Sequence, residues 1–403
     1  MATVLFVTTR IPYPPQEGHQ IRSYNLLKRI CDIHDVHLLT FARREESTAG
    51  LRHLRVICKS VRSVPIPVEY NRFQLFRELA SSLLTDRPFV VRKYFSPVMA
   101  EYIKESIENE APDLVHLDML PLAQYRRYCD NLPIVLDEHN VESLLLERRA
   151  KDGCHDVICS LFFKDQARKL RRFEMNACNA VNQVLACSFD DARTLESLAR
   201  KSIVEVIPNG VAVDYFTPRK MPDRDPFNMV FVGGMGWFPN RDGMEYFLEE
   251  VMPLVCRRMP EANCTIVGKA DGLRIPRELE PRVRLTGFVD DFRPYVWRAG
   301  LYVLPLRIGS GTRLKLLEAM AMGKAIVSTP VGCEGIDVSH GEELLVAESP
   351  KEMADAIVRL MGDPEYAHRL GERAHHKATK MYDWRSIGDR LLVIYRALLE
   401  QKG

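Results

Sequence analysis

The chain has 403 residues, of which 46% are hydrophobic and 27% are charged. This composition excludes a disordered or fibrous protein, and the length predicts two large domains. The 56 lysine and arginine residues nearly balance the 54 acidic ones, which leaves a net charge of +2. We therefore expect no nucleic-acid partner and only local anion sites.

The start of the chain and its apolar segments bear on localisation. No apolar stretch approaches the roughly 18 residues that cross a bilayer. Residues 1–10 have no basic leader and no cleavage site, and they predict a β-strand rather than a signal peptide. We expect a cytoplasmic protein.

Short β-branched runs alternate with amphipathic stretches along the first half, which is typical of βαβ units around a parallel sheet. A helix is predicted over residues 19–30, where Leu26, Leu27 and Ile30 share one face. The strands predicted in this half are residues 4–8, 36–41, 113–117, 134–137 and 181–188.

The pattern restarts after residues 203–210 and after the polar segment 217–226, which contains three prolines. We therefore predict an α/β fold of two doubly wound domains, residues 1–210 and 211–383. In the second domain the predicted strands are 229–232, 264–267, 283–286, 301–304 and 325–328, and the predicted helices lie near 241–257 and 312–322.

The glycine clusters do not match the common nucleotide fingerprints. Residues 233–236 are followed by Trp-Phe-Pro, and in 309–314 the third glycine is replaced by Leu314, so neither is a dinucleotide-binding motif. Gly268-Lys269 and Gly323-Lys324 lack the upstream glycine of a P-loop. We expect neither a dinucleotide-binding enzyme nor a nucleoside triphosphatase.

Metal sites are not expected. None of the ten cysteines has the Cys-x-x-Cys spacing of a zinc or redox site. His34 with His37, and His375 with His376, lack carboxylates or cysteines at ligand spacing. We predict reduced thiols and no metal.

A glycine loop that precedes a helix in residues 305–324 predicts an anion site. The free N–H groups and positive end of the helix attract phosphate, and the preceding strand ends where open α/β sheets bind ligands. Lys315 and Glu318 lie within about 60° of each other around this helix, so a cation and a ribose-binding carboxylate share one face. Arg313 contributes only if it lies in the non-helical turn. The segment predicts a nucleoside diphosphate site.

A structural alternative for Lys315 and Glu318 stays open. Spaced three residues apart, they could form an ion pair on a solvated face, opposite a stripe of Leu314, Leu317 and Ala321, worth about 0.2 to 0.5 kcal/mol. The glycine loop beside them favours the ligand site.

Several short motifs follow one another along nearly the whole chain. They are Arg10-Ile-Pro-Tyr-Pro-Pro15 with Gly18 and Arg22-Ser-Tyr-Asn-Leu-Leu27, Asp137-Glu-His139-Asn140, Ile207-Pro-Asn209-Gly210-Val211, Phe231-Val-Gly-Gly234, Pro239-Asn240, Gly287-Phe-Val289-Asp290, Glu318-Ala-Met-Ala-Met-Gly323 and Tyr382-Asp-Trp384. In this order they resemble the GT-B glycosyltransferases of retaining family 4, especially the bacterial sugar transferases of exopolysaccharide clusters.

The resemblance implies two Rossmann-like domains that face each other across a cleft. Residues 1–210 would bind the acceptor, residues 211–383 the nucleotide sugar, and a helix over 384–403 would cross back to the first domain. It implies that Gly18 lets the first loop approach the donor phosphate and that His139 contacts the transferred sugar.

Further roles follow from the same resemblance. Glu318 would hold the ribose, and the backbone at Val289 would lie near the base. Arg22, Asn209 and Gly234 stand in the matched motifs and are predicted to bind substrate.

The chain departs from the family pattern at two places. Ser310 stands eight positions before Glu318, where the family usually has a first glutamate, and the usual Arg and Lys are missing near Gly234 and Asp242. We expect Lys315 and a second cation to neutralise the diphosphate, because charge-assisted hydrogen bonds of about 1.5 to 3 kcal/mol suffice. The residues predicted to act with Lys315 are Gly309, Ser310, Gly311, Thr312, and Arg313 or Arg241.

We therefore expect a metal-independent glycosyltransferase of the hexosyltransferase type. It would move a sugar from a nucleotide diphosphate sugar to a glycan or polyprenyl-linked acceptor in cell-surface polysaccharide biosynthesis, with retention and without a further cofactor. Two alternatives stay open: a nucleotide-sugar 2-epimerase, which needs no acceptor, and a degenerate nucleotide-sugar binding module without turnover.

Two segments carry clustered basic residues. Residues 164–172 contain five basic residues and one acidic residue, and residues 72–93 mix Arg and Lys with Phe and Leu. They predict either solvated helix faces or a shallow contact with the inner face of the cytoplasmic membrane, where each basic residue gains about 1 kcal/mol.

Overall fold

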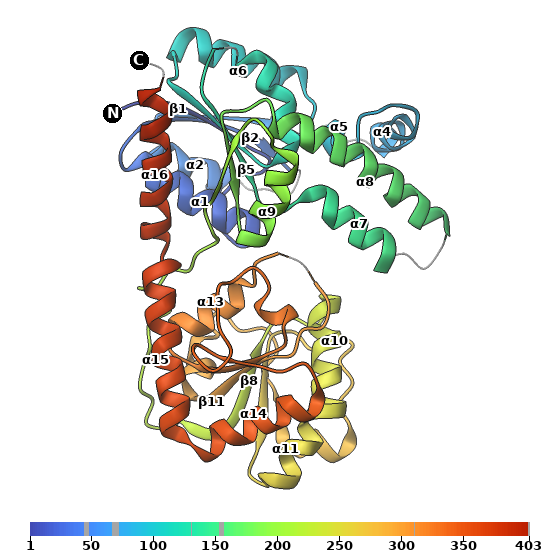
Figure 1. Cartoon of the computed structure of the whole chain (residues 1–403), viewed down its shortest axis with the longest axis vertical. Helices are drawn as coiled ribbons and strands as arrows, with labels where there is room; N and C mark the ends of the chain where they lie inside the picture. Colours follow the sequence, from blue (N-terminus) through green and yellow to red (C-terminus); the bar gives the residue numbers. More distant parts are fainter. Residues whose placement is uncertain (44–47, 67–71, 130, 153–156, 310, 402–403) are drawn as a thin grey trace. The chain divides into compact units, whose positions relative to one another are not determined.

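The computed structural model of the chain describes residues 1–43, 48–66, 72–129, 131–152, 157–309 and 311–401 (Figure 1). The chain divides into two compact units. Unit 1 contains Met1–Pro208 and Ile387–Gly403, and unit 2 contains Asn209–Ser386. Both units are α/β with parallel sheets, which confirms the predicted fold class.

Unit 1 is built on a seven-stranded parallel sheet in the order β3-β2-β1-β4-β5-β6-β7, with helices on both faces (Figure 1). The strand order reverses beside β1, which is where such sheets bind ligands. The strands are β1 (Thr3–Thr8), β2 (Asp35–Ala42), β3 (Ser60–Pro65), β4 (Leu114–Asp118), β5 (Ile134–Glu138), β6 (Gln183–Ala186) and β7 (Ile203–Val206).

The helices of unit 1 connect these strands and continue at the end of the chain. They are α1 (Gly18–Cys31), α2 (Thr48–Ile57), α4 (Arg72–Leu84), α5 (Phe89–Lys93), α6 (Pro97–Glu110), η1 (Leu120–Tyr128), α7 (Glu142–Asp152), α8 (Val157–Cys178), α9 (Phe189–Leu198) and α16 (Trp384–Glu400). From Ile387 onward α16 belongs to unit 1. Its Tyr395 hydroxyl bonds the buried His116 ring at 2.7 Å.

Unit 2 has a six-stranded parallel sheet in the order β10-β9-β8-β11-β12-β13, which reverses beside β8. Its strands are β8 (Asp225–Val232), β9 (Asn263–Val267), β10 (Val283–Leu285), β11 (Ala299–Leu304), β12 (Ala325–Ser328) and β13 (Leu345–Val346). Its helices are α10 (Phe238–Tyr246), η2 (Phe247–Val251), α11 (Met252–Arg258), η3 (Arg277–Arg282), α12 (Arg293–Arg298), α13 (Leu314–Ala321), η4 (Val331–Cys333), α14 (Pro350–Gly362) and α15 (Pro364–Met381).

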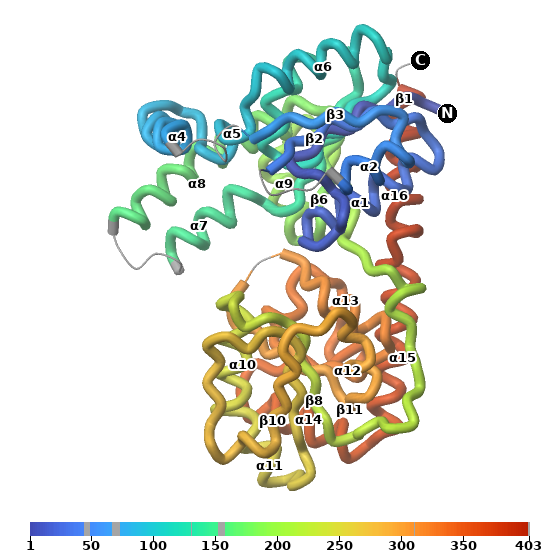
Figure 2. Tube along the Cα trace, turned by 180° about the vertical axis from the view of Figure 1, so that it is seen from behind, coloured from blue at the N-terminus to red at the C-terminus, as the bar shows by residue number. Residues whose placement is uncertain are grey.

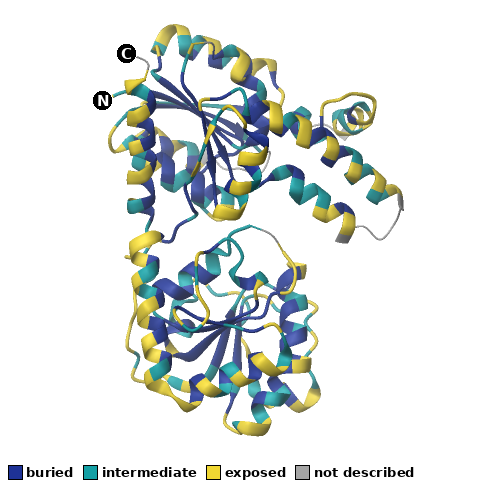
Figure 3. Ribbon diagram, in the orientation of Figure 1, coloured by how far each residue is buried: buried dark blue, intermediate teal, exposed yellow. Residues whose placement is uncertain are grey.

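Each sheet is the buried layer of its unit. The central strands are dark blue in Figure 3, whereas the outer faces of the helices are exposed. The central strands are buried on both faces, as β1 shows with all of Val4–Thr8 buried, and such strands read as continuous apolar runs. Because these runs are continuous, the central strands could be predicted from the sequence.

Three strands, β3, β7 and β13, were not predicted, and two predicted helices need correction. Strand β3 was missed because its polar residues suit a half-buried edge strand rather than an apolar run. The helix expected near 241–257 begins at Phe238 and contains a π-helical stretch, Phe247–Val251, just before Pro253, which cannot donate a helical hydrogen bond. The helix expected at 312–322 begins at Leu314, because Gly311 is left-handed at φ 77°.

Glu138 is a buried acid at the end of β5. Its side chain points to the opposite face from those of Asp137 and His139, because side chains alternate along a strand. Among the described residues, no group bonds either carboxyl oxygen of Glu138. Burial, together with the nearby carboxyl groups of Glu174 and Glu142, raises the pKa of Glu138 well above its ordinary value. Glu138 is therefore a neutral acid in the core.

We predict that Glu138→Gln is more stable than the unsubstituted protein, by a margin that widens as the pH rises above about pH 4.3. The folded protein retains a proton that the unfolded chain releases above about pH 4.3, so its stability falls as pH rises, whereas glutamine has no proton to lose. The margin should reach about 1–3 kcal/mol in thermal unfolding. The exposed Glu205→Gln is the control, and a margin independent of pH would contradict a neutral Glu138.

Candidate active site

In unit 1, the carboxyl ends of β4 and β5 bring His139 against two aspartates. His139 Nε2 lies 2.8 Å from Asp118 Oδ1 and 3.7 Å from Asp137 Oδ2, and all three side chains are buried. Burial lowers the pKa of His139, but the charges of Asp118 and Asp137 outweigh burial and raise it above the ordinary value. A protonated imidazole is thereby favoured at this edge of the sheet.

Asp118 is held by more than His139. Its Oδ2 accepts hydrogen bonds from Thr8 Oγ1 at 2.6 Å and Ser23 Oγ at 2.7 Å. Despite burial, the His139 charge holds the pKa of Asp118 far below its usual range. With Nε2 of His139 engaged by Asp118, Nδ1 is the ring nitrogen left to meet a substrate.

The sequence analysis missed Asp118 and Thr8. They end two neighbouring strands, and their backbones are register partners across β1 and β4. A polar residue at the end of each of two apolar runs was the available signal. Which runs are neighbours, however, depends on the strand order.

The contacts of Arg22 are structural, in place of the substrate contact predicted for it. Its guanidinium donates to both carboxylate oxygens of Asp137 at 2.6–3.2 Å and to the carbonyls of Ile207 and Pro208 at 2.7 and 3.2 Å. The side chain is only 1% exposed, and that of Asp137 is 0% exposed. Arg22 therefore ties α1 to β5 and to the segment after β7.

The same cluster brings metal-binding atom types together. His116, Asp118 and Asp137 can each place one such atom within 4.8 Å of the others. Yet both oxygens of Asp137 accept from Arg22, and those of Asp118 are bonded by His139 and two hydroxyls. A guanidinium at this position repels a metal ion, so these residues do not fit a metal site.

Gly18 begins α1, directly after the loop that follows β1. It is exposed, and the preceding Glu17 caps the helix through a reciprocal pair of bonds with Gln20. Arg10 and Glu17 form an ion pair at 2.7 Å within the same loop. This places the N–H groups of a helix start at the ligand-binding edge of the unit 1 sheet, as the predicted role of Gly18 requires.

In unit 2, Lys315 is anchored to the loop after β8. Its Nζ donates to Asn240 Oδ1 at 2.8 Å and lies 4.7 Å from the centre of the Phe231 ring. Asn240 Nδ2 in turn donates to the Gly234 carbonyl at 2.9 Å. A Cβ on Gly233 would lie only 2.8 Å from Lys315 Nζ. A side chain at position 233 would therefore displace the cation, and Asn240, which stands in a matched motif, is a site residue to which the sequence analysis gave no role.

The structural alternative for Lys315 and Glu318, an ion pair on a solvated face, is wrong. Both side chains are half-buried, and no ion pair joins them in the part of the chain that the structure describes. Burial lowers the pKa of Lys315 to about 8 and raises that of Glu318 to about 7. The buried residues of α13 are Leu316, Leu317, Ala319, Met320 and Ala321, so this helix has no solvated stripe.

The turn before α13 contains a buried hydroxyl. Thr312 Oγ1 is buried and has no hydrogen-bond partner among the described residues. Arg313 lies in the non-helical turn, as its predicted role requires, and its Nε donates to the Val331 carbonyl at 3.3 Å, with Glu334 at 3.8 Å. An unpaired buried hydroxyl beside a cation is suited to an anionic ligand.

Gly309 and Gly311 shape this turn. A Cβ on Gly309 would lie 2.5 Å from an Arg313 guanidinium nitrogen, and Gly311 is left-handed. Ser310 lies outside the described residues.

The other predicted residues of unit 2 lie outside the turn before α13. Arg241, in α10, extends toward Gly272, where an added Cβ would lie 3.1 Å from a guanidinium nitrogen. Val289 follows β10 and packs against the core, and Asn209 is the half-buried first residue of the unit.

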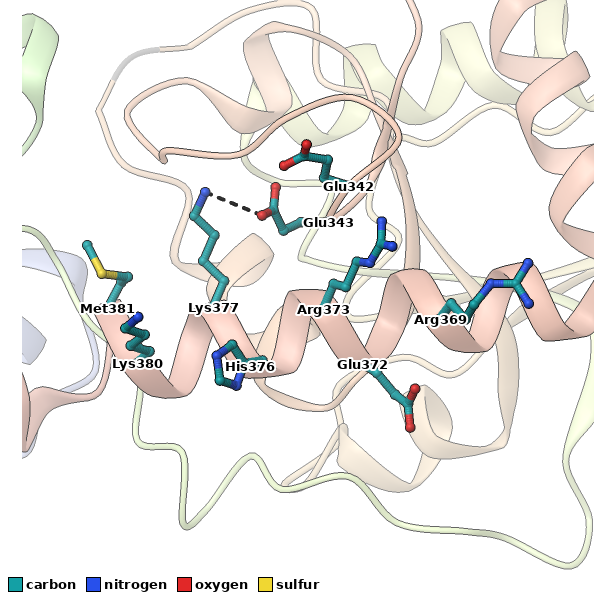
Figure 4. A pocket seen from close by; sticks show the side chains of 9 residues that line it. All are labelled: Glu342, Glu343, Arg369, Glu372, Arg373, His376, Lys377, Lys380 and Met381. Atoms are coloured by element: carbon teal, nitrogen blue, oxygen red, sulfur yellow. Dashed lines mark ion pairs between the residues drawn. The ribbon is translucent and has the colours of Figure 1, made fainter.

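A groove of about 730 Å³ runs along α15 (Figure 4). Its wall contains Lys377, which pairs with Glu343 at 3.4 Å and Asp337 at 3.3 Å, and His376. It contains none of the predicted donor-binding residues. The lining residues are Glu342, Glu343, Arg369, Glu372, Arg373, His376, Lys377, Lys380 and Met381.

Comparison with known families covers both units. Residues 17–215 match the family described as Glycosyltransferase Family 4, and residues 226–363 match Glycosyl transferases group 1. The chain is a GT-B glycosyltransferase of the family 4 type. This assignment does not favour the epimerase or the non-catalytic binding module.

Two relatives and one solved structure are similar to this glycosyltransferase. An uncharacterized 44.6 kDa protein in the cps region of Klebsiella pneumoniae is 24% identical over 378 residues, 89% of this chain and 90% of that protein. The phosphatidyl-myo-inositol mannosyltransferase of Mycolicibacterium smegmatis is 27% identical over 223 residues, 52% of this chain and 56% of that protein. The crystal structure of Anabaena HepE in complex with UDP covers 98% of this chain and 100% of that one, with a TM-score of 0.67 and 15% identity.

We predict that Asp118→Asn lowers both the pKa of His139 and the turnover of the glycosyltransferase. The substitution removes the nearest charge that favours the protonated imidazole. Loss of a hydrogen bond to a charged group, about 1.5–3 kcal/mol, corresponds to roughly a ten- to hundredfold fall in rate.

An NMR pH titration of His139, assigned with His139→Gln, measures the shift. Asp113→Asn is the matched control, because Asp113 accepts from the Thr3 N–H at the opposite edge of the sheet. An unshifted titration in a folded Asp118→Asn protein would mean that Asp118 does not tune His139.

Proposed function

We propose that this glycosyltransferase moves a sugar, with retention, from a nucleotide diphosphate sugar to a glycan or polyprenyl-linked acceptor in cell-surface polysaccharide biosynthesis. The observation that carries the proposal is the grouping at the start of α13. The buried Thr312 hydroxyl, which has no partner among the described residues, the anchored cation Lys315 and the Glu318 carboxylate follow one another there, beside the strand where the sheet order reverses.

The relatives support the donor class and the acceptor class of the proposal. HepE structures contain UDP and UDP-glucose, which supports a nucleotide-sugar donor. A phosphatidyl-myo-inositol mannosyltransferase supports a lipid-linked acceptor, and a protein of a cps region supports a role in polysaccharide synthesis. Since a polyprenyl-linked acceptor lies in a bilayer, we also propose a peripheral contact with the inner face of the cytoplasmic membrane.

The diphosphate is proposed to bind the turn before α13. N–H groups of this turn, the Thr312 hydroxyl and Lys315 neutralise it without a divalent ion, with Arg313 or Arg241 as the second cation. The leaving diphosphate gains charge in the transition state, so donors that are already positioned stabilise it more there than in the ground state.

Other residues are proposed to bind the remaining parts of the donor. Glu318 accepts from the ribose hydroxyls, and the backbone at Val289 lies near the base. His139 contacts the transferred sugar, and Gly18 allows close approach of the first loop to phosphate.

Incubation with radiolabelled UDP- and GDP-sugars and polyprenyl diphosphate acceptors tests the proposal. Label in the acceptor, with the anomeric configuration of the donor by NMR, supports it. An epimerised nucleotide sugar, or tight donor binding without transfer to any acceptor of this class, would contradict it.

The pH dependence of donor affinity follows from the two shifted groups of α13. We predict that UDP-glucose binds most tightly between about pH 7 and pH 8. Above pH 8 Lys315 loses the proton that makes it a cation, and below pH 7 Glu318 gains a proton and becomes a weaker acceptor. The diphosphate of UDP-glucose does not itself titrate in this range.

Calorimetry with UDP-glucose over this pH range checks the prediction. Lys315→Ala should flatten the alkaline limb, and Glu318→Gln should flatten the acid limb. An alkaline limb that survives unchanged in Lys315→Ala would remove Lys315 from the diphosphate site.

We predict that Lys315→Ala lowers the transfer rate roughly ten- to a hundredfold, since one charge-assisted hydrogen bond is worth about 1.5–3 kcal/mol, and that EDTA has no effect. Lys351→Ala is the matched control, because Lys351 is an exposed lysine in the first turn of α14 in the same unit. Activity abolished by EDTA and restored by manganese would contradict metal independence, and a Lys315→Ala enzyme at full rate would contradict the role of the lysine.

A further inference from the structure

Helix α4 (Arg72–Leu84) turns its apolar side chains outward. Phe73, Phe76, Leu83 and Leu84 are exposed by 74, 71, 54 and 88%. At 100° per residue these four side chains fall within an arc of about 100°. The helix therefore has a continuous apolar stripe on the side that a soluble protein normally keeps polar.

Polar contacts fix this orientation from the inner side. Lys169 Nζ, from α8, donates to the Ser82 carbonyl at 2.7 Å, and the Ser82 side chain is itself buried. Glu78 Oε2 accepts from Arg92 Nε, in the neighbouring α5, at 2.8 Å. Turning the stripe inward would break these bonds and take from Arg92, whose side chain is only 21% exposed, its carboxylate partner, so the outward stripe is the stable arrangement.

Helix α8 has an exposed face with apolar and basic side chains of its own. Ile158 and Leu161 are exposed by 82 and 60%, and basic residues follow them on the same side of the helix. At 100° per residue, the exposed residues between Ile158 and Arg172 cover an arc of about 140° around the helix axis. The exposed basic residues of this face are Lys164, Arg168, Arg171 and Arg172.

The apolar and basic groups belong to one part of unit 1. Figures 1 and 2 show α4 and α8 together at one side of the sheet, and Gln166 Nε2 bonds Ser82 Oγ at 3.4 Å between them. Four of the five basic residues in 164–172 are exposed, whereas Lys169 is buried against Ser82, and the chain as a whole carries only +2. The exposed positive charge of this segment therefore lies on the helix that neighbours α4.

We infer that these two helix faces form a docking surface for an anionic lipid bilayer. This α4–α8 surface comprises Phe73, Phe76, Leu83, Leu84, Ile158, Leu161, Lys164, Arg168, Arg171 and Arg172. Phenylalanine and leucine enter the headgroup boundary while lysine and arginine meet anionic headgroups, as in helices that lie in the plane of a membrane. None of the described helices has the length and apolar character to cross a bilayer, so docking is peripheral.

A bilayer suits this surface better than a second copy of the chain. Two copies would bring the basic rows of α8 together, and like charges repel. An anionic membrane supplies the opposite charge for the basic row and an apolar phase for the stripe. The inference rests on the proposed function in one respect, because a polyprenyl-linked acceptor gives the enzyme a reason to dock.

Vesicle sedimentation tests the surface independently of catalysis. We expect the full chain to bind vesicles of phosphatidylglycerol and phosphatidylcholine, with weak binding to pure phosphatidylcholine and release at high salt. The double variant Phe73→Ser with Phe76→Ser should bind at least tenfold more weakly, as should Lys164→Glu with Arg168→Glu. Phe189→Ser, which alters a 61% exposed phenylalanine on α9, is the matched control and should bind normally.

Equal vesicle binding by the Phe73/Phe76 variant and the unsubstituted chain would overturn the inference. So would a dimer in sedimentation velocity that this variant abolishes, because the surface would then pair two copies. Transfer to a water-soluble acceptor analogue should be unchanged in both double variants. Failure of the unsubstituted chain to transfer sugar would contradict the proposed function but would leave the vesicle result standing.

Discussion

Parallel strands place their carboxyl ends at one edge of a sheet, and in both units the strand order reverses beside the first strand. This constraint brings residues that are distant in sequence together. In unit 1 it joins Thr8 to Asp118 and His139, and in unit 2 it joins the loop after β8 to α13 through Asn240 and Lys315. The chemistry of each unit depends on this geometry.

The buried charges of unit 1 are arranged in pairs. An unpaired charge in a protein interior is costly, so a stable fold pairs each one. Asp137 is paired with Arg22, and Asp118 is paired with His139. The Arg22–Asp137 pair fixes the end of β5, which carries His139. Asp118 engages Nε2 of the His139 ring, so Nδ1 is the nitrogen that can meet a substrate.

Much of the fold and part of the site could be predicted from the sequence. Continuous apolar runs located the central strands, and the glycine loop before Lys315 and Glu318 located the candidate donor site. The edge strand β3 was missed because its pattern is half polar, and Arg22 was misassigned because its partner, Asp137, lies 115 positions away. A periodic pattern shows that α4 has an apolar stripe, but only tertiary contacts show that the stripe faces outward.

A crystal structure with UDP-glucose tests the central claim most directly. The account predicts the diphosphate against the turn before α13, within hydrogen-bonding distance of Lys315 Nζ and Thr312 Oγ1, with the ribose hydroxyls at Glu318. A nucleotide bound elsewhere, such as in the groove along α15, or a diphosphate held by a metal ion at the α13 turn, would contradict it.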